Sequence, residues 1–205
     1  MSNTLKIFLR LSYSQKLIYI RKALARVKTV TIYKLMFSQI GWRCFIIRPL
    51  FITPEFISMG DRVKVWHDSR IEGIDKYGES HFLPKIVIED GVEIQQRVHI
   101  TFIGNLKIGE CTSILPDVLI TDIDHIYEDI EKHPGEQGIN CKPTSIGKYC
   151  SIGAGSKLLA GCTLGNNCIV GANSVVKGNF PDGSIIAGSP ARIIKRYNYS
   201  SRKWT

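Results

Sequence analysis

The chain has 205 residues, of which 44% are hydrophobic, so it suits one globular domain and is not a disordered chain. The formal net charge is +9, but residues 1–50 hold ten Lys or Arg and no Asp or Glu, which leaves the rest nearly neutral. A nucleic-acid-binding body needs a basic face of its own, so we expect no nucleic-acid partner. The apolar runs are too short for a membrane span, and the N-terminus lacks the cleavage site of a secretory signal. We therefore expect a cytoplasmic protein with six reduced cysteines.

Residues 1–48 are predicted to form a basic, mostly helical N-terminal segment. Leu17, Ile20, Leu24 and Val27 recur at helical spacing, and the Lys and Arg residues lie largely elsewhere on the helical wheel. Such a helix can rest on an anionic membrane surface, here the inner face. It can equally pack its apolar stripe on the body of the protein or on a second subunit. Both interpretations stay open.

Residues 49–190 are predicted to form the main domain, in which an aliphatic residue recurs at every sixth position from Ile88 to Val176, with a two-residue shift at Leu106 and Lys107 and a 20-residue gap before Ile146. The twelve positions are Ile88, Ile94, Ile100, Ile108, Ile114, Ile120, Ile146, Ile152, Leu158, Leu164, Val170 and Val176. A period of six fits neither a helix nor a coiled coil. It predicts a solenoid of three short strands per 18-residue coil, with the aliphatic side chains inward. One coil cannot bury its own core, so the coils must stack as parallel strands.

The fifth position of each window is a second inward site and should hold a small residue. It is occupied by Thr112, Cys150, Ser156, Cys162, Cys168 and Ser174. A weaker pair of windows begins at Ile57 and Val63. Residues 69–85 and 126–145 interrupt the repeat as loop excursions, and loops this long are usually functional. Residues 191–205 are a tail, in which 191–198 are predicted to form a short helix that caps the core.

Three stretches carry a family resemblance: ITDIDHIYED (120–129), TSIGKYCSIGAGSKLLAGCTLGNNCIVGANSVVKG (144–178) and GSIIAGSPARIIK (183–195). Over about residues 50–196 the chain resembles the hexapeptide-repeat acyltransferases, and it is most similar to the bacterial polysaccharide and sugar O-acetyltransferases. The resemblance implies a left-handed parallel β-helix, although parallel crossovers are normally right-handed. It also implies acetyl-CoA as co-substrate and a homotrimer with active sites between subunits. No metal spacing occurs among the Cys and His residues.

His125 is the candidate general base. A thioester is already activated, so acyl transfer lacks only a nucleophile that has lost its proton. A positioned His can take that proton near neutral pH, which contributes roughly 10²- to 10⁴-fold. Asp122 or Asp124 could hold the other ring nitrogen. The resemblance supports the same choice, because the catalytic His of the family follows an Asp at the end of a coil.

The resemblance also suggests where the donor binds. The backbone contacts that the family makes to CoA, and the basic residues available for the CoA phosphates, map onto Ala154, Ala172, Lys177, Arg192, Lys195 and Arg196.

For the acceptor, Tyr127 and Glu128 in the long loop are candidate contacts, and Trp66 could stack on a sugar, with core or interface packing as the alternative. Thr101 stands where some members have Asn, and Ser151 where many have Trp.

These residues predict an acetyl-CoA-dependent O-acetyltransferase that acts on a sugar of a surface polysaccharide or its lipid-linked or nucleotide-linked precursor, by direct transfer without an acyl-enzyme. N-acetylation of an amino sugar by the same fold and base remains an alternative. A non-catalytic solenoid scaffold is a second alternative, of a different class. The trimeric carbonic anhydrases of this fold need closely spaced metal-binding histidines, which this sequence lacks.

Overall fold

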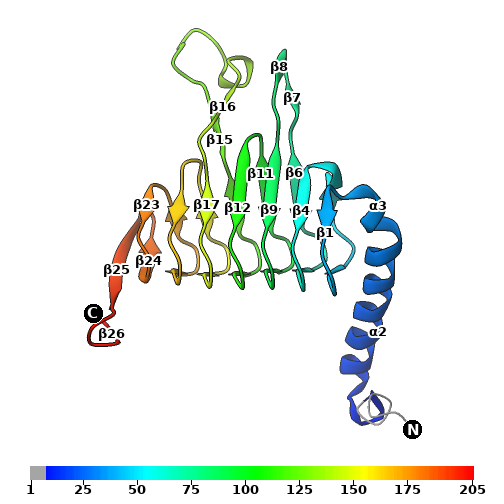
Figure 1. The fold of residues 1–205 in the computed structure, drawn as a ribbon. Coiled ribbons are helices and arrows are strands. Elements are labelled where there is room, and N and C mark those ends of the chain that lie inside the picture. Colours follow the sequence, from blue (N-terminus) through cyan, green and yellow to red (C-terminus); the bar gives the residue numbers. More distant parts are fainter. Residues whose placement is uncertain (1–7) are drawn as a thin grey trace.

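The structure is a computed structural model that describes residues 8–205, a helix followed by a three-sided solenoid of parallel strands (Figure 1). Helix α2 (Tyr13–Lys28) continues through a π-helical turn, η1 (Thr29–Tyr33), into α3 (Lys34–Met36). A capping box starts α2: Ser12 Oγ accepts the Gln15 N–H, and Gln15 Oε1 accepts the Ser12 N–H. Within residues 8–205, no helix is both long enough and apolar enough to cross a membrane.

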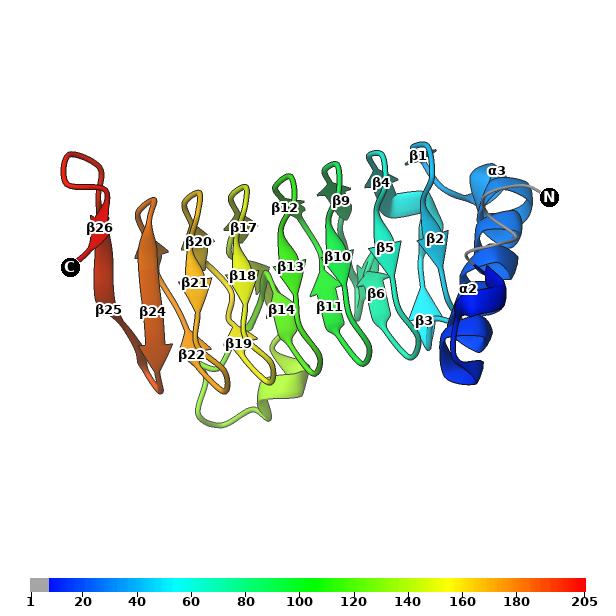
Figure 2. The same cartoon turned by 90° about the horizontal axis from the view of Figure 1, so that it is seen from below.

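Each side of the solenoid is one sheet, which we call A, B or C. Sheet A contains β1 (Gln39–Ile40), β4 (Ile57–Met59), β9 (Lys85–Ile88), β12 (Asn105–Ile108), β17 (Ser145–Ile146), β20 (Thr163–Leu164) and β23 (Asn179–Phe180). Sheet B contains β2 (Phe45–Ile46), β5 (Lys64–Val65), β10 (Glu93–Ile94), β13 (Ser113–Ile114), β18 (Ser151–Ile152), β21 (Ile169–Val170), β24 (Ser184–Gly188), β25 (Ala191–Asn198) and β26 (Lys203–Trp204). Sheet C contains β3 (Phe51–Ile52), β6 (Arg70–Gly73), β11 (His99–Phe102), β14 (Leu119–Thr121), β19 (Lys157–Leu158) and β22 (Val175–Val176). Figure 2 shows the coils stacked one strand apart from α2 to the C-terminus.

The register confirms the predicted 18-residue coil. Ile146 pairs with Leu164 in sheet A, and Leu158 pairs with Val176 in sheet C. All twelve predicted aliphatic positions are buried. At the second inward site the hydroxyls bind backbone carbonyls: Ser156 Oγ donates to Gly171 O at 2.9 Å. Small polar residues therefore fit this position because the next coil supplies an acceptor.

The solenoid begins earlier than the sequence predicts. Strands β1 and β2 already belong to sheets A and B, ahead of the expected boundary at residue 49. The weak windows assigned to Ile57 and Val63 are two residues out of register, because Met59 pairs with Ile88 and Val65 pairs with Ile94. Ile57 and Met59 both point inward from β4, so the alternation of the strand hides the true start of the window.

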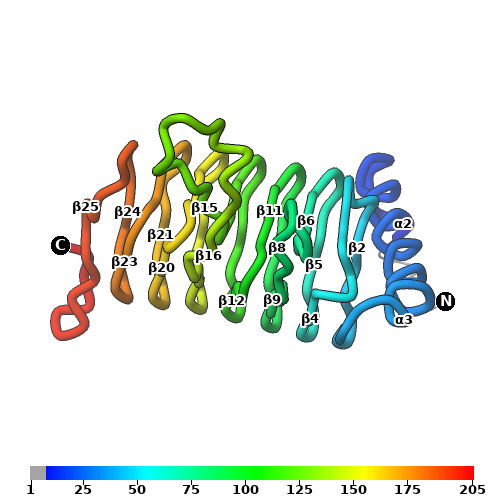
Figure 3. The backbone as a smooth tube through the Cα atoms, turned by 90° about the horizontal axis from the view of Figure 1, so that it is seen from above, coloured from blue at the N-terminus to red at the C-terminus, as the bar shows by residue number. Residues whose placement is uncertain are grey.

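The two excursions both leave the corner that joins sheet C to sheet A, and they rise side by side above the solenoid (Figures 1 and 3). The first spans residues 74–84 rather than 69–85 and forms a hairpin of β7 (Lys76–Tyr77) and β8 (Ser80–His81). The second spans residues 122–144, and its stem pairs β15 (Ile123–His125) with β16 (Ile139–Cys141) in antiparallel fashion. It therefore begins four residues before the predicted range of 126–145, and His125 lies on the stem instead of at a corner of the coil.

The helix predicted over 191–198 is wrong, because these residues form strand β25. After the Gly188–Ala191 turn, β25 pairs antiparallel with β24 and closes the last edge of sheet B. An open sheet edge offers unpaired N–H and C=O groups, and Ile193 and Ile194 suit a strand better than a helix.

Candidate active site

His125 ends β15 and its side chain is exposed. Tyr77, from the neighbouring hairpin, meets the His125 ring edge-on, with ring centroids 6.1 Å apart and an interplanar angle of 76°. The Tyr77 hydroxyl also donates to Gly135 O at 3.2 Å, so the two excursions contact each other. Nothing in the sequence singles out Tyr77, since no spacing relates the two excursions before the chain folds. An imidazole in this position is accessible to an acceptor.

Positive side chains surround the carboxylate beside His125. Lys142 forms an ion pair with Asp124 and holds the pKa of that carboxyl below its usual range. Lys177 and His125 act in the same direction with smaller effects. The structure thus brings the predicted donor-binding residue Lys177 near Asp124. Asp124 is ionised there and stabilises a neighbouring positive charge.

The Asp122 side chain is held by contacts other than the predicted one with the His125 ring. Its side chain is fully buried, and it accepts the Ile103 N–H at 2.9 Å and the Gly104 N–H at 3.0 Å. Burial raises the pKa of the Asp122 carboxyl, against the effect of these two N–H groups. Among the hydrogen bonds of residues 8–205, none joins Asp122 or Asp124 to the His125 ring. Asp122 is an anchor between coils, at the base of the second excursion.

Three residues predicted to contact the acceptor, Thr101, Tyr127 and Glu128, lie on the second excursion or beside its stem. Thr101 Oγ1 donates to Thr121 Oγ1 at 3.3 Å, and Thr121 Oγ1 accepts the Ile123 N–H at 3.0 Å, so Thr101 neighbours the stem that carries His125. Tyr127 is exposed, and the Tyr127 N–H donates to Glu128 Oε2 at 3.0 Å. Tyr127 and Glu128 both belong to the second excursion, which thus carries two of the predicted acceptor contacts.

Trp66 is not part of this cluster. It follows β5 on sheet B, where its indole N–H donates to Glu93 Oε1 at 3.0 Å. Its ring stands edge-on to Phe45, with centroids 5.6 Å apart, and the Lys22 ammonium of α2 lies 4.9 Å from its centroid. These contacts match the packing alternative and give no support to a role in sugar binding.

Two of the predicted CoA contacts, Ala154 and Ala172, occupy another corner. Ala154 and Ala172 stack in consecutive coils where sheet B turns into sheet C, and the Asn173 N–H donates to Ala154 O at 2.9 Å. The three basic candidates, Arg192, Lys195 and Arg196, are exposed along β25. Within one chain, sheet C therefore separates the Ala154–Ala172 corner from His125.

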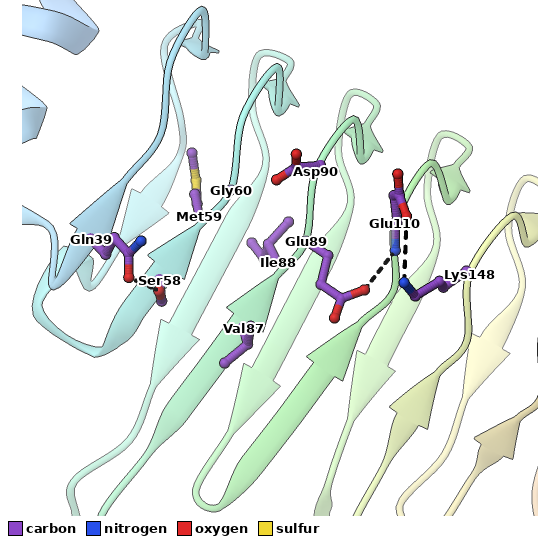
Figure 4. A pocket seen from close by; sticks show the side chains of 10 residues that line it. All are labelled: Gln39, Ser58, Met59, Gly60, Val87, Ile88, Glu89, Asp90, Glu110 and Lys148. Carbon is purple, nitrogen blue, oxygen red and sulfur yellow. Dashed lines mark hydrogen bonds and ion pairs between the residues drawn. The ribbon is translucent and has the colours of Figure 1, made fainter.

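A pocket of 390 Å³ lies on the outer side of sheet A (Figure 4). It contains none of the predicted site residues. Its charged side chains already have partners, since Lys148 pairs with Glu110 at 3.4 Å and Glu89 Oε2 accepts the Glu110 N–H at 3.0 Å. Nothing in its wall requires a ligand. Within residues 8–205, no group of His, Cys, Asp and Glu is arranged to hold a metal ion.

The repeated coils and the exposed His125 define the class of transferases built on hexapeptide repeats. Residues 143–178 match the family described as bacterial transferase hexapeptide (six repeats). The chain is 35% identical over 145 residues to nodulation protein L of Rhizobium meliloti, a match that covers 66% of this chain and 78% of that protein. The chain belongs to this hexapeptide-repeat transferase family, and its solenoid is a left-handed parallel β-helix.

Two further comparisons point the same way. The chain is 36% identical over 126 residues to the putative lipopolysaccharide biosynthesis O-acetyl transferase WbbJ of Escherichia coli. That match covers 58% of this chain and 64% of WbbJ, so the chain spans less than two thirds of this relative. The structure of AntD, an N-acyltransferase from Bacillus cereus in complex with dTDP and 3-hydroxybutyryl-CoA, superposes with a TM-score of 0.63 at 19% identity. It covers 84% of this chain and 90% of that chain, and at this identity the likeness concerns the fold.

Proposed function

We propose that this protein is an O-acetyltransferase that uses cytoplasmic acetyl-CoA and acetylates a sugar of a surface polysaccharide or of its precursor. The observation that carries the proposal is His125, exposed on the stem of the second excursion, in a chain of the hexapeptide-repeat transferase family. The name of WbbJ, a relative from lipopolysaccharide biosynthesis, supports the sugar acceptor and the oxygen nucleophile.

In the proposed reaction, His125 takes the proton of the acceptor hydroxyl as its oxygen attacks the thioester carbonyl. The new C–O bond forms, the C–S bond breaks, and the departing thiolate of CoA recovers the proton from the imidazolium. No acyl-enzyme is formed. A general base in this position contributes roughly 10²- to 10⁴-fold.

We infer that the complete site needs more than one subunit. The predicted donor contacts Ala154 and Ala172 lie at one edge of sheet C, and His125 lies beyond the other edge. A homotrimer, as the family resemblance implies, would bring the donor corner of one subunit towards His125 of the next. The basic side chains of β25 would then meet the CoA phosphates.

N-acetylation is the second candidate. The observation that favours it is the similarity in fold to AntD, an N-acyltransferase whose structure contains dTDP. A free amine on a nucleotide-linked sugar is a better nucleophile than a hydroxyl and depends less on a base. The two reactions are separated by offering the enzyme matched acceptors that carry either an amino or a hydroxyl group at one position.

The test combines donor binding with activity. Titration calorimetry with acetyl-CoA should show binding to the wild type and to His125→Ala alike, while acetylation of sugar acceptors should fall at least about 100-fold in the variant. His67→Ala is a matched control, because His67 bonds Asp68 Oδ2 at 2.8 Å on sheet B, away from the site. If neither the wild type nor the variant binds acetyl-CoA, the transferase proposal fails, and the scaffold alternative becomes the better account.

A further inference from the structure

Helix α2 packs on the first coil of the solenoid by one narrow side. Ala25, Thr29, Tyr33 and Phe37 are the buried residues of this region. The Ile46 N–H of β2 donates to Thr29 Oγ1 at 3.1 Å, and Thr29 Oγ1 donates to Ala25 O at 2.7 Å. These two hydrogen bonds fix which side of α2 faces the solenoid. Figures 1 and 3 show the helix lying across the N-terminal end of the solenoid, and Figure 1 shows its first turns projecting past the coils.

A second side of α2 carries an uncovered apolar stripe. Its members follow each other at steps of four, three, four and three residues and are 40–77% exposed: Tyr13, Leu17, Ile20, Leu24 and Val27. At 3.6 residues per turn, this spacing keeps them on one side, turned away from Ala25. Leu35 of α3 extends the apolar surface with 88% exposure. A stripe of this width normally faces a partner.

Basic side chains flank the stripe at Lys16, Arg21 and Lys28, whereas Lys22 and Arg26 lie against the Trp66 and Phe45 rings of the solenoid. Residues 1–50 contain no Asp or Glu. In the part of the chain that the structure describes, the basic side chains of α2 form no ion pair; they are Lys16, Arg21, Lys22, Arg26 and Lys28. Beside the stripe, a groove of 470 Å³ between α2 and β2 is lined by Arg21, Lys28 and Arg48 together with Leu24 and Ile46. Cationic walls over an apolar floor suit an anionic headgroup.

We propose that α2 docks the protein on an anionic lipid bilayer. The apolar stripe enters the interfacial layer, and the flanking Lys and Arg side chains contact the headgroups. The charge decides against a contact between the α2 helices of two copies, because two such helices would oppose cations with no acidic residue to pair them.

The full chain is tested by flotation with vesicles of phosphatidylcholine alone, or mixed with one third of phosphatidylglycerol, at low and high salt. We expect binding to the anionic vesicles that weakens at high salt. Lys16→Glu with Arg21→Glu should lower this partition at least about 25-fold, at about fivefold per lost basic side chain. Leu24→Gln with Val27→Gln should lower it at least about tenfold, because both side chains lose apolar contact.

The control variants carry the same kinds of substitution at positions outside α2. Arg202→Glu with Lys203→Glu at the C-terminal end, and Leu83→Gln in the exposed first excursion, should partition as the wild type does. Circular dichroism checks that each variant is folded. Equal binding of the wild type to neutral and anionic vesicles would overturn the proposal. Sedimentation velocity tests the other occupant. If the wild type does not bind vesicles and the oligomer dissociates in the variant Leu24→Gln with Val27→Gln, the stripe contacts a second copy. Acetylation of a soluble acceptor is a separate readout and does not depend on docking.

Discussion

Asp122 offers a quantitative test of how the second excursion is anchored. The two oxygens of its buried carboxyl each accept one backbone N–H, from Ile103 and Gly104. Asp122→Ala leaves both donors without a partner in a buried place, at about 1–3 kcal/mol each. We therefore expect the free energy of unfolding to fall by about 2–6 kcal/mol. Asp122→Asn keeps one acceptor oxygen, so we expect a loss of about 1–3 kcal/mol.

The assay is denaturant unfolding at one fixed protein concentration, over a range of pH. Because burial raises the pKa of Asp122 above its ordinary value of 3.8, the folded protein holds this proton more tightly than the unfolded chain. The stabilisation that the Asp122 carboxyl contributes is fully present below its pKa in the unfolded chain. It is lost as the pH rises through the pKa of Asp122 in the folded protein. The advantage of the wild type over Asp122→Asn should therefore shrink with rising pH in this window.

The alternative role for Asp122, orientation of the His125 ring, predicts the reverse pattern. In that case Asp122→Asn would cut kcat and change the pH profile of activity while stability moved by less than about 0.5 kcal/mol. That combination would refute the anchor. A pH profile equal to that of the wild type, together with a lower unfolding free energy, supports it.

Two further predictions concern the core and the contact between the excursions. Leu158→Ala, at a fully buried position of β19, should cost about 2–5 kcal/mol in denaturant unfolding, while Ile169→Ala on the outer side of β21 should cost less than about 1 kcal/mol. Tyr77→Phe removes the bond to Gly135 O but keeps the ring beside His125, so amide hydrogen exchange of residues 126–138 should speed up with kcat/KM for the acceptor lowered a few-fold. An unchanged exchange rate in Tyr77→Phe would show that this bond does not hold the excursions together.

The repeat was predictable because its rule is local. An inward aliphatic residue such as Ile146 or Ile152 recurs wherever a short strand begins, so the period in the sequence is the period of the coils. The predicted register was wrong at β4. Ile57 and Met59 both point inward there, so Ile57 was assigned as the start of the window in place of Met59. Positive φ favours glycine, yet Asn167 and Tyr149 adopt it at corners of the solenoid, because the stacked coil fixes the turn.

The site was predictable only in part. His125 stands out by its place beside a long gap in the repeat, and the structure brings Lys177 near its neighbour Asp124. The contact with Tyr77 and the packing of Trp66 under α2 depend on parts of the chain that are distant in sequence, and no period records them. Strand β25 was missed because its partner, the open edge of β24, exists only once the chain has folded, although Ile193 and Ile194 already suit a strand.

The number of stacked coils also sets distances along the axis of the solenoid. Sheet C runs β3, β6, β11, β14, so the strand from which the second excursion departs lies three steps from the first coil, beside which α2 packs. At about 4.8 Å for each step, the stem of His125 leaves the solenoid about 14 Å along its axis from that coil. Adding or deleting a whole 18-residue coil between β6 and β14 would shift this distance by one step and leave the stem at the same corner. Height along the axis and orientation around it are thus set by separate features of the sequence, the number of repeats and the place of the excursion within a repeat.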